Sequence, residues 1–96
     1  MKSLQKKNKN YLKLERIVKG FANHRRIQIL ELLEKNPELS VIEITQELNM
    51  NFKTASEHIR RLAISGLIMK RSDGTNIRHK LTERGLKVLK FLRTLE

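Results

Sequence analysis

Residues 40–66, SVIEITQELNMNFKTASEHIRRLAISG, decide the fold of this 96-residue chain. Ser40 and Glu43 have the S-x-x-E spacing of a capping box, which predicts that a helix starts directly after the serine. Asn51 is a good N-cap for a second helix, because its side-chain oxygen can accept a hydrogen bond from an otherwise unpaired backbone N–H. Gly66 favours the left-handed conformation that ends many helices. The stretch therefore predicts two helices joined by a short turn.

The second of these helices has one apolar face and one polar, basic face. Its apolar stripe at helical spacing consists of Ala55, Ile59, Leu62 and Ala63. The opposite face carries Lys53, Glu57, Arg60 and Arg61. A short helix, a three-residue turn and a basic second helix form the helix-turn-helix pattern, whose second helix enters the major groove of DNA.

Two short strand-like runs, residues 67–71 and 77–81, follow this helix. Asp73-Gly74 between such runs is a strong hairpin signal. A two-residue Asp73-Gly74 turn would pair Lys70 with Ile77. A three-residue loop that includes Thr75 would instead gather the apolar side chains on one face, and we favour that loop. A basic hairpin directly after a recognition helix is a wing.

We expect DNA to contact the exposed face of the second helix and the wing. Lys53 lies in the first turn, near base edges and phosphates, whereas Arg60 and Arg61 reach phosphates rather than bases. For Thr54, DNA contact and local capping are equally open. Glu57 either accepts a hydrogen bond from a cytosine N4 or pairs with Arg61 at i,i+4, and we favour the pair. The candidate DNA-binding residues are Lys53, Thr54, Ser56, Glu57, Arg60, Arg61, Arg71, Thr75, Asn76 and Arg78.

Three further helices are predicted, over residues 11–21, 24–35 and 83–95, with Asn23 and Thr82 as N-caps of the last two. The middle one is apolar over so wide an arc that we expect it at the centre of the core. The outer two carry more apolar surface than a thin core covers, so we favour pairing with a second copy over a wide buried helix. The predicted dimer interface consists of Tyr11, Leu14, Val18, Val88, Phe91, Leu92 and Leu95.

The net charge of +11, from 21 Lys and Arg against 10 acids, favours a polyanionic partner. Aromatic residues are scarce, which argues against single-strand binding on stacked rings. Residues 1–10 form a basic arm, which we expect to be flexible and solvated rather than bound to phosphate, and residues 11–96 form one DNA-binding domain.

Several other kinds of site are not expected. The chain has no cysteine, and no apolar run is long enough for a signal sequence or a membrane span, so we expect a cytoplasmic protein. His24, His58 and His79 lack the spacing of metal ligands and read as structural or surface residues. No paired carboxylates, activated nucleophile or glycine-rich phosphate loop is present, so we expect no enzyme and no cofactor.

Three segments resemble the ArsR-type winged helix-turn-helix transcriptional regulators, and the likeness covers about residues 21–92. Ala22–Leu30 is similar to that family's entry to its second helix, and Glu38–Ile44 to its third helix. Thr54–Ile59, with Leu62 and Gly66-Leu67, is similar to its recognition helix. The Leu-Thr-x-x-Gly pattern at Leu81–Gly85 occurs across many winged-helix families, so a MarR-like assignment stays open.

The resemblance implies a mostly α fold with a small β-hairpin, in the order helix–helix–helix–helix–hairpin–helix. It also implies a homodimer, paired through its first and last helices, that reads a two-fold symmetric operator and represses transcription. Many members release DNA on binding a metal, through two cysteines in the third helix or through Asp and His on the last. Ser40 and Ile42 stand at the cysteine positions, and Glu83–Glu96 contains neither Asp nor His. We therefore expect no metal site, and the signal stays open.

The sequence thus predicts a sequence-specific regulator that binds double-stranded DNA, with neither membrane nor metal among its partners. One alternative is an architectural DNA-binding protein of low specificity, which the charge fits equally well. The other is a winged-helix protein–protein interaction module that uses its apolar last helix.

Overall fold

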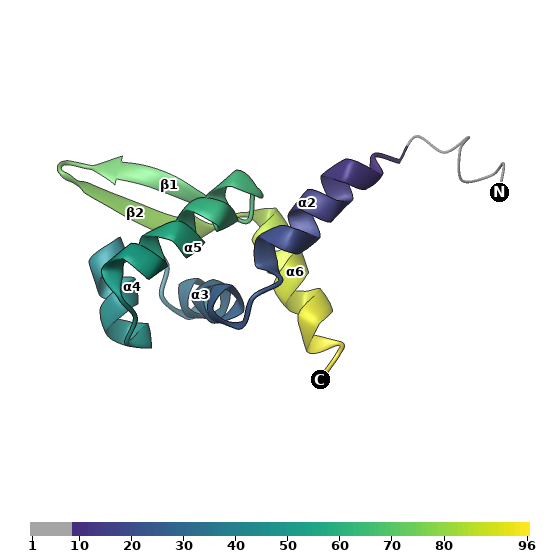
Figure 1. Ribbon diagram of the computed structural model, residues 1–96. Coiled ribbons are helices and arrows are strands. Elements are labelled where there is room, and N and C mark those ends of the chain that lie inside the picture. The colour runs from purple at the N-terminus through teal and green to yellow at the C-terminus, as the bar shows by residue number, and fades with distance from the viewer. Residues whose placement is uncertain (1–8) are drawn as a thin grey trace, which may run out of the picture.

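Five helices and one antiparallel hairpin make up the part of the chain that the computed structural model describes, residues 9–96 (Figure 1). The basic arm predicted at residues 1–10 lies almost wholly outside the described residues. The elements are α2 (Tyr11–Phe21), α3 (His24–Lys35), α4 (Val41–Leu48), α5 (Phe52–Ile64), β1 (Ile68–Asp73), β2 (Asn76–Leu81) and α6 (Glu83–Arg93). This is the winged helix-turn-helix order predicted from the sequence.

Each helix starts at a side-chain cap. The predicted N-caps Asn23, Ser40, Asn51 and Thr82 all accept hydrogen bonds from backbone N–H groups of the next turn. The Ser40 cap is reciprocal, because Glu43 accepts from the Ser40 N–H at 2.9 Å, so the capping box is confirmed. Such caps stabilise a helix by about 1 kcal/mol each, which explains why the helix starts could be placed from sequence.

The core is built around α3, as its wide apolar arc predicted. Ile29, Leu30 and Leu33 are fully buried, and α3 packs on α4, α5, α6 and β2. The rest of the core comes from every element: Phe21, Ile44, Ile59, Leu62, Leu67, Ile68, Leu81, Val88 and Leu89. The other elements are therefore held against one central helix, which orients α5 and the hairpin relative to each other.

The register of the hairpin differs from both predicted alternatives. Ile68 pairs with Leu81 and Asp73 pairs with Asn76, so the loop is the two-residue Gly74-Thr75. Gly74 has φ +63°, and a type II′ turn requires positive φ at its first central residue. The glycine conformation, together with burial of the Ile68–Leu81 pair, therefore decided the register.

A third chain segment extends the hairpin at its base. The Leu39 carbonyl accepts from the His79 N–H at 2.9 Å and lies 2.8 Å from His79 Nδ1. The Glu38 N–H donates to the His79 carbonyl at 2.9 Å. His79 is only 1 % exposed, so it is a structural histidine that joins the wing to the chain before α4.

Two close contacts position the helices around α5. The Arg25 guanidinium of α3 donates to the Leu48 carbonyl at 2.7 Å and so holds the end of α4 at the helix-turn-helix turn. Gly20 lets α2 approach the C-terminal end of α5, because a Cβ at this position would lie 1.8 Å from Ser65 Oγ. These contacts fix the recognition helix from both ends.

One residue of the predicted dimer interface belongs to the core of the chain itself. Val88 is 8 % exposed and lies in the same buried stripe as Gly85 and Leu89, while Leu92 is partly buried against it. The prediction for Val88 is therefore wrong. Spacings of three and four residues along α6 place Gly85, Val88, Leu89 and Leu92 in one inward stripe, and leave Leu86, Phe91 and Leu95 exposed.

Candidate nucleic-acid interface

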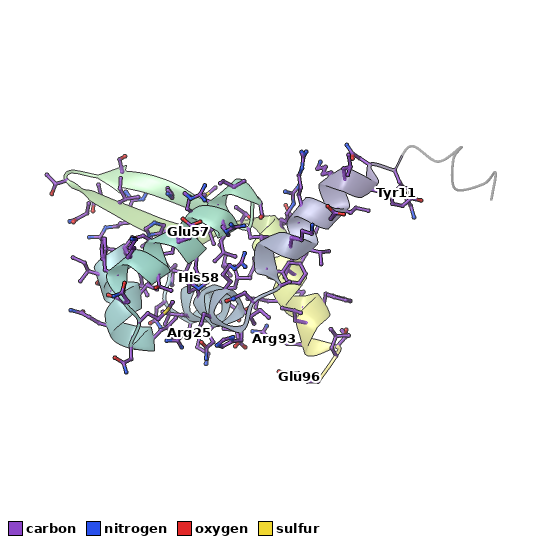
Figure 2. The ribbon with its side chains drawn as sticks, viewed as in Figure 1. Tyr11, Arg25, Glu57, His58, Arg93 and Glu96 are labelled. Atoms are coloured by element: carbon purple, nitrogen blue, oxygen red, sulfur yellow. The ribbon has the colours of Figure 1, made fainter. Side chains whose placement is uncertain are left out.

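The recognition helix α5 buries one face and exposes the other, as predicted. Ala55, Ile59 and Leu62 are at most 1 % exposed and pack on α3 and α4. Asn49, in the turn before α5, adopts the left-handed conformation with φ +51°, which asparagine tolerates better than most residues. In Figure 2 the labelled His58 lies between α5 and α3, and it is half-buried, whereas its neighbour Glu57 is exposed. The outer side is therefore free for a partner.

The first turn of α5 presents side chains rather than backbone N–H groups. Asn51 Oδ1 accepts from the Lys53 N–H at 2.8 Å and from the Thr54 N–H at 3.3 Å, so this cap already occupies both donors. The Lys53 side chain is exposed and forms no ion pair with the described residues. The Thr54 and Ser56 hydroxyls have no hydrogen-bond partner within residues 9–96, so the capping role considered for Thr54 belongs to Asn51.

Glu57 is occupied by the arginines that follow it. Its carboxylate lies 2.7 Å from Arg60 Nη2 and 3.4 Å from Arg61 Nε, which confirms the predicted i,i+4 pair and adds an i,i+3 pair. The hydrogen bond from Arg60 lowers the pKa of Glu57 to about 2. The carboxylate is therefore charged at neutral pH and offsets part of the positive charge of α5.

The arginines of the wing are also paired within the chain. Arg78 Nε donates to Asp73 at 2.7 Å, and its Nη1 donates to the Glu38 carbonyl at 3.0 Å. Arg71 lies 3.3 Å from the Glu38 carboxylate. The hydrogen bond from Arg78 lowers the pKa of Asp73, so Asp73 is charged in this pair at neutral pH. Both arginines thus brace the middle of the hairpin, where they lie opposite each other, whereas Thr75 and Asn76 are exposed at its tip.

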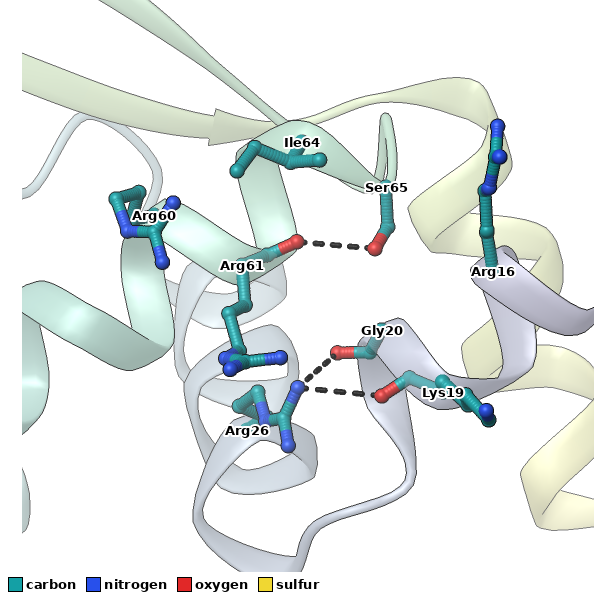
Figure 3. Close-up of a pocket in the computed structure, with 8 residues that line it drawn as sticks. All are labelled: Arg16, Lys19, Gly20, Arg26, Arg60, Arg61, Ile64 and Ser65. Atoms are coloured by element: carbon teal, nitrogen blue, oxygen red, sulfur yellow. Dashed lines mark hydrogen bonds between the residues drawn. The ribbon is translucent and has the colours of Figure 1, made fainter.

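Sequence reasoning missed a group of cations that only the tertiary structure brings to α5. Arg16 and Lys19 of α2 and Arg26 of α3 line a cavity together with Arg60 and Arg61 (Figure 3). No spacing along the chain joins these residues, and the cluster forms because Gly20 permits the close crossing of α2 and α5.

Other kinds of site find no support among residues 9–96. No three His, Cys, Asp or Glu side chains are grouped there as metal ligands. His24, His58 and His79 lie on three different elements, α3, α5 and β2. None of the described helices has the length and apolar character that crossing a membrane requires.

Residues 23–69, which run from the N-cap of α3 into β1, match a family model described as winged helix-turn-helix DNA-binding. The transcriptional activator HlyU of Vibrio cholerae is 33% identical over 87 residues, which cover 91% of this chain and 80% of HlyU. This chain belongs to the winged helix-turn-helix transcriptional regulators. The resemblance to ArsR-type members is confirmed, and the relatives are regulators rather than enzymes.

Two further relatives match most of this chain. An uncharacterized HTH-type transcriptional regulator of Methanocaldococcus jannaschii, MJ1325, is 31% identical, over 85% of this chain and 93% of its own. The solution structure of the homodimeric winged helix-turn-helix DNA-binding domain of Mb0332 from Mycobacterium bovis, a possible ArsR-family regulator, superposes with a TM-score of 0.78. It is 31% identical and covers 86% of this chain and 77% of that one.

Proposed function

We propose that this regulator is a homodimer that binds a two-fold symmetric site in double-stranded DNA and represses transcription without a metal. The polar face of α5 carries the proposal: the Lys53 ammonium group and the Thr54 and Ser56 hydroxyls make no ion pair or hydrogen bond within residues 9–96. Unpaired donors on a helix of this fold are suited to base edges and phosphates in the major groove. The wing tip, with Thr75 and Asn76, would meet the adjacent backbone or minor groove.

An apolar surface at the other end of the molecule supports the dimer. In Figure 1, α2 and α6 lie at the end opposite the wing tip. Val18 of α2 and Phe91 of α6 are 52 % and 55 % exposed, and exposed apolar side chains that gather on one face mark interaction surfaces. The proposed interface contains Tyr11, Leu14, Val18, Phe91 and Leu95, with Leu92 at its edge and without Val88.

Repression needs nothing beyond occupation of the DNA site, which is why we propose it. Ser40, the N-cap of α4, and Ile42 within α4 offer no soft ligand, which supports regulation without a metal. HlyU is called an activator, so a reporter gene downstream of the selected site should decide the direction. Reporter output that rises with the protein would reverse this part of the proposal. A regulator of this kind would act in the cytoplasm.

Selection from a random pool of duplex DNA at near-physiological salt tests the main proposal. We expect an inverted repeat whose half-sites are about one helical turn apart, as a dimer with two recognition helices requires. Retention without a motif would favour the low-specificity architectural protein, which the charge also fits. A dimer that retains no DNA would favour the protein–protein module.

The dimer can be tested separately by exchanging Phe91 for serine. We expect sedimentation to show monomers for F91S at concentrations where the unmodified protein is dimeric. Serine at the exposed Leu86 is the matched control, because this α6 residue is not in the proposed interface. Loss of the dimer in both variants, or in neither, would contradict the interface as drawn.

A further inference from the structure

A basic cavity of about 450 Å³ lies between the C-terminal ends of α2 and α5 and the start of α3 (Figure 3). Five of its lining side chains are cations, and we call this cavity the arginine pocket. The cations are Arg16, Lys19, Arg26, Arg60 and Arg61. The volume falls in the range of roughly 300–1,000 Å³ that is usual for sites of small molecules.

Nearby acids neutralise only part of this charge. Two carboxylates, Glu15 and Glu57, pair with Lys19 and with the two arginines of α5. Arg16 and Arg26 form no ion pair with any residue of 9–96. Five cations against two carboxylates leave a net charge of +3 at one cavity. Cationic side chains this close together repel one another, and a bound anion would relieve that repulsion.

Arg26 is the most constrained of the five. Its Nη1 donates to the carbonyls of Lys19 and Gly20, at 3.2 and 3.0 Å, where α2 ends. Its Nε is buried and has no hydrogen-bond partner within residues 9–96. Burial, and then repulsion from Arg61, lower the pKa of Arg26. A guanidinium held in this way, beside a second one, gains from any anion that enters the pocket.

We propose that the arginine pocket binds a phosphate group. Planar guanidinium groups match the oxygens of phosphate and can donate two hydrogen bonds to it at once. Arg60 and Arg61 also belong to the exposed face of α5, so one source is a backbone phosphate of bound DNA. In that case the inference rests on the proposed function. The other source is a free phosphorylated molecule, which would compete with DNA for these arginines.

A double variant, R16Q/K19Q, tests the pocket while leaving the Arg26 bonds to the α2 backbone in place. Both side chains are exposed, and only Lys19 has an ion pair to lose. The matched control is K87Q/K90Q on α6, which has the same spacing, the same loss of charge and one ion pair, to Glu83. Thermal melting should show both variants folded. If the double variant does not fold, R16Q alone replaces it.

The first measurement is the dissociation constant for duplex DNA as a function of salt. If a DNA phosphate occupies the pocket, R16Q/K19Q should lower the slope of log K against log salt by about 0.9 for each phosphate lost. The control should keep the slope of the unmodified protein. The second measurement is calorimetric titration with inorganic pyrophosphate in the absence of DNA. Saturable 1:1 binding that R16Q/K19Q loses and the control keeps would identify a free phosphorylated molecule.

The two measurements separate this inference from the proposed function. A change in either one, confined to R16Q/K19Q, supports the pocket and names its source. If neither the salt slope nor pyrophosphate binding differs between R16Q/K19Q and the control, the pocket does not bind phosphate. If the unmodified protein binds no DNA, the proposed function fails, and pyrophosphate alone decides about the pocket.

Discussion

The crossing of α2 and α5 can be tested by giving Gly20 a side chain. A Cβ at this position would lie 1.8 Å from Ser65 Oγ and 2.4 Å from Ser65 Cβ. Ordinary carbon contacts are longer by about 1 Å or more, so the two helices must separate, because rotating the serine hydroxyl does not move its Cβ. The same crossing forms one wall of the arginine pocket.

The expected cost of G20A combines two opposing effects. Overpacking costs about 1–3 kcal/mol, and alanine in place of glycine in a helix returns about 0.5–1 kcal/mol. The two ranges combine to a fall of about 0–2.5 kcal/mol in the free energy of unfolding, with about 1 kcal/mol in the middle of the range. For a domain of this size, a fall of about 1 kcal/mol lowers the Tm by roughly 4–8 °C. Melting followed by circular dichroism, at one fixed protein concentration, measures this change.

A double-mutant cycle with S65G provides the control. Without the serine side chain, the nearest remaining atom of residue 65 to the new Cβ is its Cα, at 3.9 Å. In the S65G background G20A should therefore stabilise the protein by about 0.5–1 kcal/mol, which gives a coupling free energy of about 1–3 kcal/mol. An equal effect of G20A in both backgrounds would refute the close crossing.

Three other perturbations have expected outcomes. K53A should weaken binding to the selected DNA site by about 1–3 kcal/mol in a titration, while K90A on α6 should not; equal affinities would remove the assigned role of Lys53. E57Q frees two arginines and should tighten binding to any duplex up to about fivefold, whereas weaker binding to the selected site alone would show that Glu57 reads a base. Burial lowers the pKa of His79, so below pH of about 6.5 the unfolded chain binds a proton that the folded chain does not. The free energy of unfolding should therefore decrease as the pH is lowered below about 6.5, by at most about 1.4 kcal/mol per pH unit for this residue. In denaturant titrations at several pH values, H79Q should flatten this dependence of the unfolding free energy on pH, while H24Q should not.

The register of the hairpin depends on more than its local sequence. The Asp-Gly signal places the turn within one residue, but the chain adopts a register other than the two that the sequence predicts as alternatives. Burial of Ile68 opposite Leu81, and the bridge from Leu39 to His79, involve residues far apart in sequence. A shift of one residue moves every side chain to the other face of a strand, so small local uncertainty produced a different pairing.

The sequence by itself determined the helices, their starts, and which face of α5 is buried. These features depend on caps and on side chains three or four residues apart, so each is complete within one turn of helix. The Glu57–Arg61 pair was predictable for the same reason. The tertiary structure alone decided that Val88 belongs to the core, that Arg78 donates to the Glu38 carbonyl, and that Arg26 and Arg61 line the same cavity. These contacts join elements that are distant along the chain, and only the packing of α2, α5 and α6 around α3 brings them together.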